Sequence, residues 1–241
     1  MRYAFVSDVH GNLESLERAL ALVDADDALA CLGDMVGYCA NPNECVRLLR
    51  DATTHAILGN HDLAALENYG TEFFNEAARA AIEWTQRVLD DESRRWLNGL
   101  SYELRLPELL MVHGAPVNYF EYILDKRAAG RAFARTDAPL IFVGHTHIAQ
   151  YWVREPDGTI GHKHLQTGGE LTLDPECRYI VDVGSVGQPR DLNPEASMAF
   201  FDTEQRLVRW VRYPYPIDAV QSKIRAAHLP NYLAERLEVG R

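Results

Sequence analysis

Apolar runs and amphipathic segments alternate over the first 60 residues of the chain. The run RYAFVS is typical of a buried strand, and the segment that starts at Leu13 repeats its apolar residues at helical spacing. Asn41-Pro42 is a typical opening of the next helix. Alternating strands and helices imply a mostly parallel sheet with helices packed outside it. The pattern predicts strands at 2–7, 28–32 and 54–58 and helices at 13–24 and 43–51.

The pattern from about Glu72 to Leu100 is helical. Several of its apolar side chains lie close to one helical face, namely Phe73, Ala77, Ala80, Ala81, Trp84 and Val88. We interpret this segment, with outer bounds of about 68–100, as a small helical insertion that caps a site and adds no strand to the sheet. Trp84 and Trp96 are expected to pack in the core.

Strand-like runs dominate the second half, with turns such as Pro156-Asp157-Gly158 between them. Residues 216–228 are expected to form an amphipathic helix with Ile217, Val220, Ile224 and Ala227 facing inward. The change from alternating elements to strands predicts an α/β protein (α+β in some schemes) with two mixed sheets stacked face to face and helices outside. The predicted strands are 101–106, 108–112, 140–143, 148–154, 160–165, 170–173, 178–183, 196–202 and 206–213.

Composition adds limits on size, partners and location. The 241 residues are 47% hydrophobic and 24% charged, so we expect a single domain over residues 1–241 with a full core. A formal net charge of −11 disfavours an extended nucleic-acid surface, and no apolar stretch is long enough to span a membrane. Asp8 and His10 arrive before any signal-peptide region, so a cytoplasmic location is expected.

Residues that bind metals follow predicted strand ends at five places. In an open α/β sheet, the loops beyond the carboxyl ends of parallel strands meet in one crevice, so these residues are expected to converge. The glycines beside them allow tight turns and close approach of the backbone. The five places are Ser7-Asp8-Val9-His10, Gly33-Asp34, Gly59-Asn60-His61-Asp62, His113-Gly114 and Gly144-His145-Thr146-His147.

The residue types at these places suit divalent ions. Asp supplies a hard anionic oxygen, Asn a neutral oxygen, and imidazole binds zinc, iron and manganese. One ion needs about four to six ligands, so a larger set with a shared carboxylate suits two ions, with manganese, iron and zinc as the candidates. The seven candidate ligands are Asp8, His10, Asp34, Asn60, His113, His145 and His147.

The motifs resemble those of the calcineurin-like metallophosphoesterases, whose pattern is D-x-H, G-D, G-N-H-D/E, H and G-H-x-H. Three further stretches, GDMVGYCANPNECV, AIEWT and GSVGQPRD, are similar to those of small bacterial and archaeal phosphoesterases often grouped with diadenosine tetraphosphatases. The resemblance implies a four-layer α-β-β-α sandwich. It also implies one ion on Asp8, His10 and His147, a second on Asn60, His113 and His145, and Asp34 as the bridge.

The resemblance further implies hydrolysis of a phosphodiester, a phosphomonoester or a nucleoside polyphosphate. Two divalent ions lower the pKa of a bridging water, and the hydroxide then attacks phosphorus. His61 is expected to point past the ions and to protonate the leaving oxygen or stabilise its charge, with Asp62 orienting the imidazole. The expected partner is a small phosphorylated substrate, with a nucleotide as one candidate.

Four other residues are candidates for binding the substrate. The guanidinium of Arg190 matches phosphate oxygens, although a surface salt bridge explains a single loop arginine equally well. Tyr38, Asn75 and Arg79 could line the pocket, while packing or capping explains them at least as well.

Two other functions remain open. One is a binding scaffold of the same fold that has lost its chemistry, and the other is a protein Ser/Thr phosphatase. The scaffold is disfavoured because His61 and the seven candidate ligands are all present. The phosphatase is disfavoured because the chain is short and shows no recognisable groove for a protein substrate.

Overall fold

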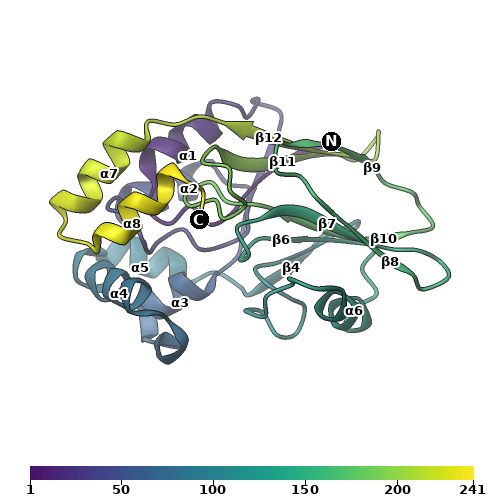
Figure 1. Ribbon diagram of the computed structural model, residues 1–241. Coiled ribbons are helices and arrows are strands. Elements are labelled where there is room, and N and C mark those ends of the chain that lie inside the picture. The colour runs from purple at the N-terminus through teal and green to yellow at the C-terminus, as the bar shows by residue number, and fades with distance from the viewer.

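Two mixed β-sheets of six strands each lie at the centre of the protein, whose computed structural model describes residues 1–241 (Figure 1). The first sheet has the spatial order β3 (His55–Ala56), β2 (Ala28–Cys31), β1 (Arg2–Val6), β11 (Ala196–Asp202), β12 (Leu207–Tyr213) and β9 (Gly169–Thr172). The second has the order β4 (Glu103–Arg105), β5 (Leu110–Val112), β6 (Leu140–Val143), β10 (Arg178–Val183), β7 (Ala149–Arg154) and β8 (Ile160–His164).

Helices cover the outer faces of both sheets. Those that share a hydrophobic cluster with the first sheet are α1 (Leu13–Leu20), α2 (Pro42–Ala52), α3 (Asn60–Glu67), α4 (Glu76–Val88), α5 (Asp91–Asn98), α7 (Ile217–Ala226) and α8 (Asn231–Glu235). Helix α6 (Lys126–Ala134) packs on the second sheet, away from the other helices (Figure 1). Short 3₁₀ helices lie at Thr71–Phe73 (η1) and Arg236–Glu238 (η2).

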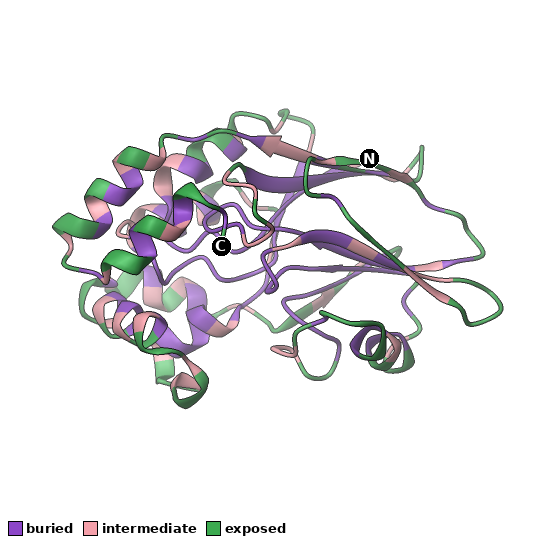
Figure 2. Ribbon diagram, viewed as in Figure 1, coloured by how far each residue is buried: buried purple, intermediate pink, exposed green.

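Alternating side chains of the buried strands divide the core into three clusters. In β1, Ala4 packs against the outer helices, whereas Phe5 packs between the sheets. In β6, Ile141 faces α6, whereas Phe142 faces the first sheet and stacks on Phe5 at 3.8 Å. Burial on both faces explains why these strands read as continuous apolar runs. Figure 2 shows buried residues along the inner strands and exposed residues on the outward faces of the helices. The four-layer α-β-β-α sandwich is confirmed.

The parallel strands of each sheet bring their carboxyl ends to a common edge. β1, β2 and β3 are parallel neighbours, and β5, β6 and β10 form the corresponding group in the second sheet. The antiparallel strands β11 and β7 lie next to these groups in the first and second sheet. The loops that leave the parallel strands therefore start from adjacent points.

The helical segment expected over 68–100 consists of η1, α4 and α5. The inner face predicted for this segment is displaced by about one residue. In α4, Ala78, Ile82 and Thr85 are buried together with Ala81, and Phe73, in η1, is 87% exposed. Trp84 and Trp96 pack against the first core cluster, as expected. None of the helices combines the length and the apolar character that crossing a bilayer requires.

Candidate metal centre

Five strand ends deliver the candidate ligands to one place. Asp8 and His10 follow β1, Asp34 follows β2, and Asn60 opens α3 just beyond β3. In the second sheet, one ligand follows β5 directly and two lie in the loop between β6 and β7; these are His113, His145 and His147. Both sheets thus contribute to a single cluster at the edge where their parallel strands end.

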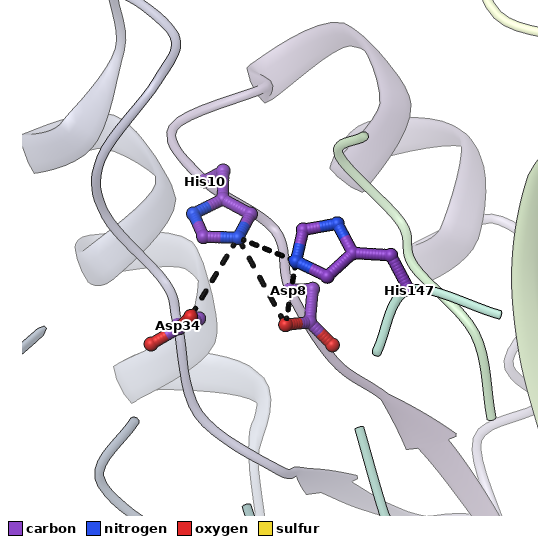
Figure 3. A group of neighbouring side chains, drawn as sticks. All are labelled: Asp8, His10, Asp34 and His147. Atoms are coloured by element: carbon purple, nitrogen blue, oxygen red, sulfur yellow. Dashed lines mark hydrogen bonds and ion pairs between the residues drawn. The ribbon is translucent and has the colours of Figure 1, made fainter. Parts of the chain in front are cut away.

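The first group consists of Asp8, His10, Asp34 and His147, all buried (Figure 3). Nε2 of His147 lies 3.1 Å from Oδ1 of Asp8, and Nε2 of His10 lies 3.8 Å from the same oxygen. The His10 Nε2 is also 3.7 Å from Oδ2 of Asp34 and 3.2 Å from Nε2 of His147. These atoms surround a space of the size that one ion needs.

The second group shares Asp34 with the first and adds His113 and His145, with the three ligand atoms all within 4.8 Å of one another. Nε2 of His113 lies 3.3 Å from Oδ2 of Asp34 and 3.2 Å from Oδ1 of Asn60. The carboxylate of Asp34 therefore lies between the two groups, where a bridging ligand is expected.

Each of the four candidate imidazoles has one ring nitrogen next to a backbone carbonyl. Nδ1 of His10, His113 and His147 lies 2.9, 2.8 and 2.6 Å from the carbonyl oxygens of Val36, Leu32 and Gln188. In His145 it is Nε2 that lies 3.0 Å from the Phe120 carbonyl. A ring nitrogen that donates its proton to a carbonyl fixes the other nitrogen as a lone-pair acceptor, which is how histidines that bind metals are oriented.

In the first group, the remaining lone-pair nitrogens and the carboxylate oxygen face one another, and no hydrogen-bond donor lies between them. Nε2 of His10 and Nε2 of His147 are 3.2 Å apart, and the buried Oδ1 of Asp8 has no hydrogen-bond partner. Two lone pairs at this distance repel, and a buried unpaired carboxylate oxygen costs a few kcal/mol. A cation at this position satisfies all three atoms at once, so the residues fit a metal ion.

The pKa values of the histidines reflect their burial and the nearby carboxylates. Burial alone lowers the pKa of His113, but the carboxylates of Asp34 and Asp8 outweigh it and raise this pKa to about 10. Burial also lowers the pKa of His10 and of His145 well below the usual range. Positive charge is therefore stabilised next to Asp34, where the second group meets the first.

The backbone at the centre is strained. Asp8, His10, Asp34, His145 and His147 have φ of 53°, 52°, 54°, 68° and 61°. Residues other than glycine rarely adopt this left-handed conformation, which costs on the order of 1–3 kcal/mol each and concentrates at functional sites.

Two glycines allow this close approach of loops. A Cβ on Gly59 would overlap the Asp34 carboxylate, and one on Gly144 would overlap Ser7 and lie 2.5 Å from Oδ2 of Asp8. The motif glycines thus leave room for the two carboxylates.

His61 lies beside the centre, packed among aromatic rings. Its ring centroid is 4.7 Å from that of His10, 4.6 Å from Tyr38 and 4.6 Å from Phe74, and its buried Nδ1 has no partner. Burial lowers the pKa of His61 to about 4, so the imidazole is neutral near pH 7. A neutral imidazole carries one N–H that can be donated to a substrate oxygen.

Asp62 does not orient His61, so this expectation is wrong. Oδ1 of Asp62 accepts hydrogen bonds from the backbone N–H groups of Met35 and Val36 at 2.8 and 3.1 Å, and Oδ2 accepts from Gly59 at 3.0 Å. His61 and Asp62 are consecutive residues of α3, and consecutive helical side chains do not face each other. Asp62 instead joins the loop after β2 to the start of α3.

Arg190 lies at the edge of the centre without a carboxylate partner, which rules out the surface salt bridge. Its NH2 group donates to the Tyr38 hydroxyl and to Oε1 of Gln188, each at 3.2 Å, and its buried Nε has no partner. The backbone N–H of Arg190 donates to the carbonyl of His147 at 3.1 Å. A cation held this close to a phosphate-sized site without a counter-charge is suited to bind an anion.

Asn75 and Arg79 do not line the centre. Asn75 is exposed and caps α4, where its side chain accepts from the backbone N–H of Ala78. Arg79 is exposed and donates to the carbonyl of Phe74 at 3.2 Å. Capping and local bonding account for both side chains, and neither residue lines the pocket beside the centre, so their contact with substrate stays a prediction.

Asp182 supports the His145-Thr146-His147 loop and was not predicted from the sequence. Its carboxylate accepts from the Thr146 hydroxyl at 2.6 Å and from the backbone N–H of Gly184 at 3.1 Å. It lies in β10, within a run of apolar residues, and a charged residue inside a buried strand was the signal for it.

A pocket opens directly beside the second group. It is shared with the centre through Asn60 and His145, and its remaining lining residues are Tyr69, Gly70, Phe73, Phe74, Asn118, Phe120 and Tyr122. Sequence reasoning missed these aromatic residues, which come from the loop after α3 and the loop after β5. Clustering of aromatic residues in two loops that follow ligand motifs was the available signal.

Comparisons with known proteins agree with the fold. Residues 1–206 match the family described as the calcineurin-like phosphoesterase superfamily domain. An uncharacterized protein of Methanocaldococcus jannaschii is 36% identical over 246 residues, which cover 99% of this chain and 98% of that protein. The crystal structure of a metallophosphoesterase from Sphaerobacter thermophilus is similar over the full length of both chains, with 37% identity and a TM-score of 0.90. A hypothetical protein from Pyrococcus horikoshii shares the fold at 18% identity and a TM-score of 0.76, over 100% of this chain and 98% of that one. The chain belongs to the calcineurin-like phosphoesterase superfamily.

Proposed function

We propose that this protein hydrolyses phosphoester bonds of a small phosphorylated compound with two bound divalent ions. One observation carries the proposal: Nε2 of His10 and Nε2 of His147 face each other at 3.2 Å beside an Asp8 oxygen that has no partner. A divalent cation satisfies such a set of acceptors in a buried site. Manganese, iron and zinc all suit imidazole and carboxylate ligands.

The two groups of side chains would each hold one ion. Asp8, His10 and His147 form the first set, Asn60, His113 and His145 form the second, and Asp34 is common to both. When bound, two such ions polarise the phosphoryl group and supply hydroxide near neutral pH. The protein's own contribution is a rigid arrangement in which the outer nitrogen of each histidine is held by a backbone carbonyl.

His61 and Arg190 would act on the substrate. Neutral His61 donates its N–H to the leaving oxygen and so stabilises the charge that develops there. Arg190 binds a non-bridging phosphate oxygen, since its guanidinium has N–H groups that no protein carboxylate uses. Tyr38 holds the guanidinium in place through its hydroxyl and through the face of its ring, 5.7 Å away.

The test combines metal analysis with hydrolysis of two chromogenic esters, p-nitrophenyl phosphate and bis(p-nitrophenyl) phosphate. We expect two equivalents of divalent metal per chain after loading, and turnover of at least one ester. The test variant is Asp34→Asn, at the shared ligand. Its matched control is Asp137→Asn, at a carboxylate that is 91% exposed. Two bound ions without turnover of any phosphoester would instead identify a binding scaffold, and absence of metal would disprove the proposal.

A further inference from the structure

The pocket beside the second group is continuous with the metal centre. Asn60 and His145 belong to both, so a substrate whose phosphorus lies at the centre extends directly into this space. The pocket has a volume of about 320 Å³. That is within the range of sites for small molecules and is large enough for a single planar group attached to a phosphate.

Aromatic rings line this pocket and are fixed to the centre by stacking. Tyr122 stacks on His145 with ring centroids 3.8 Å apart and an angle of 17° between the planes. Phe74 stacks on His61 at 4.6 Å and 29°. The pocket therefore presents flat apolar surfaces at a fixed distance from the reacting atoms.

Several rings at the mouth of the pocket are exposed to water. Phe73, Tyr69 and Tyr122 are 87%, 63% and 45% exposed, whereas the aromatic residues between the sheets are buried. Large exposed apolar side chains grouped at a concave site indicate a surface that a ligand covers. Aromatic rings that stack on a nucleic-acid base contribute about 1–3 kcal/mol per base.

The pocket has no charged lining residue. Its polar groups are the Asn118 amide, the hydroxyls of Tyr69 and Tyr122, and the two residues shared with the metal centre. Arg190 is not among the lining residues, but its guanidinium, bonded to Tyr38 and Gln188, also lies next to the hydroxyl of Tyr122 at the wall of the pocket. One cation at this wall matches a single phosphate group, and the remaining lining suits an uncharged planar group.

We infer that this pocket binds the planar aromatic part, an aryl group or a nucleobase, of a phosphoester whose phosphorus lies at the metal centre. The inference rests on the proposed function. It assigns the substrate to esters with one aromatic substituent next to the reacting phosphate.

Binding of carbon analogues that cannot be hydrolysed tests the inference without relying on activity. Protein loaded with Mn²⁺ is titrated calorimetrically with methylphosphonate, with benzylphosphonate, and with the methylenephosphonate analogue of adenosine 5′-monophosphate. We expect benzylphosphonate to bind about tenfold more tightly than methylphosphonate, because its ring stacks in the pocket. A nucleoside analogue that binds more tightly still identifies a nucleobase as the natural group, and equal affinity of the two aromatic compounds identifies a general aryl site.

The double variant Tyr69→Ala/Phe73→Ala removes the two most exposed rings of the pocket. We expect the preference for benzylphosphonate to fall below threefold, while the affinity for methylphosphonate and the metal content stay the same. Tyr232→Ala is the matched control, since Tyr232 is 52% exposed and lines a different cavity. Its preference should equal that of the wild type.

Two results overturn the inference, and they differ from each other. If both phosphonates bind with affinities within twofold of each other, the aromatic pocket has no role and the proposed function stands. If methylphosphonate does not bind to the metal-loaded protein, the phosphate site itself is wrong and the inference fails with it.

Discussion

The metal centre and the adjoining aromatic pocket differ in burial and in charge. The centre is buried, charged and rigid: its carboxylates are at most 1% exposed, and the imidazoles are oriented by backbone carbonyls. The pocket is uncharged and open, and two of its rings, those of Tyr69 and Phe73, are more than half exposed. Chemistry common to a large family requires fixed geometry, whereas the choice of substrate can vary in loops without disturbing it.

Asp34→Asn is expected to have the largest effect, because Asp34 is common to both metal groups. An amide lacks the second anionic oxygen that a bridge requires, so turnover should fall by roughly a thousandfold or more. Mn²⁺ at about a hundred times its dissociation constant should stabilise the wild type by about 2.7 kcal/mol, seen as a higher Tm. This shift should be much smaller in Asp34→Asn. A variant that retains two ions and normal turnover contradicts the assignment of Asp34.

His61→Gln should separate catalysis from metal binding within the centre. We expect turnover to fall by about 10²–10⁴-fold, as for loss of a group that transfers or donates a proton to a leaving group. Metal content should be unchanged, because His61 belongs to neither metal group. Esters with a better leaving group should show a smaller loss, since they need less stabilisation of the leaving oxygen. Equal losses for good and poor leaving groups would argue against this role.

Arg190→Lys tests whether Arg190, at the edge of the metal centre, binds the phosphate group of the substrate. A lysine keeps the charge but cannot present the planar fork that Arg190 offers to a phosphate, so inhibition by inorganic phosphate should weaken about tenfold. KM should rise more than kcat falls if the contact is made in the ground state. Arg105→Lys, at an exposed arginine paired with Asp137, is the matched control. Unchanged inhibition by phosphate would remove Arg190 from the substrate site.

The difference between the two regions also explains what the sequence could predict. The ligands of the centre occur in motifs of two to four residues at strand ends, so local patterns place them and sheet topology brings them together. The pocket depends on loops of unrelated sequence, with Phe73 from one and Tyr122 from another. No local pattern shows which loops lie side by side.

Two errors of the sequence analysis have clear physical causes. Helix α3 was missed because five consecutive residues in it are buried, so no amphipathic period marks it. Missing α3 led directly to the wrong contact between Asp62 and His61, since adjacency in sequence was taken as adjacency of side chains. Helix α6 was also missed by the sequence analysis, although its sequence contains a helix signal. Asp125 caps the helix, and Ala128, Ala132 and Phe133 are buried at helical spacing.

Phe73→Ala should have the smallest effect on the folded protein and gives the sharpest contrast between the two regions. A ring that is 87% exposed contributes little to burial, so the free energy of unfolding should change by less than about 0.5 kcal/mol. Phe5→Ala, at a ring buried between the sheets and stacked on Phe142, should cost about 3–5 kcal/mol. Urea denaturation of both variants, with metal content measured alongside, checks this. If Phe73→Ala destabilised the protein as much as Phe5→Ala, the exposed ring would be part of the core packing, and a ligand would not be needed to explain it.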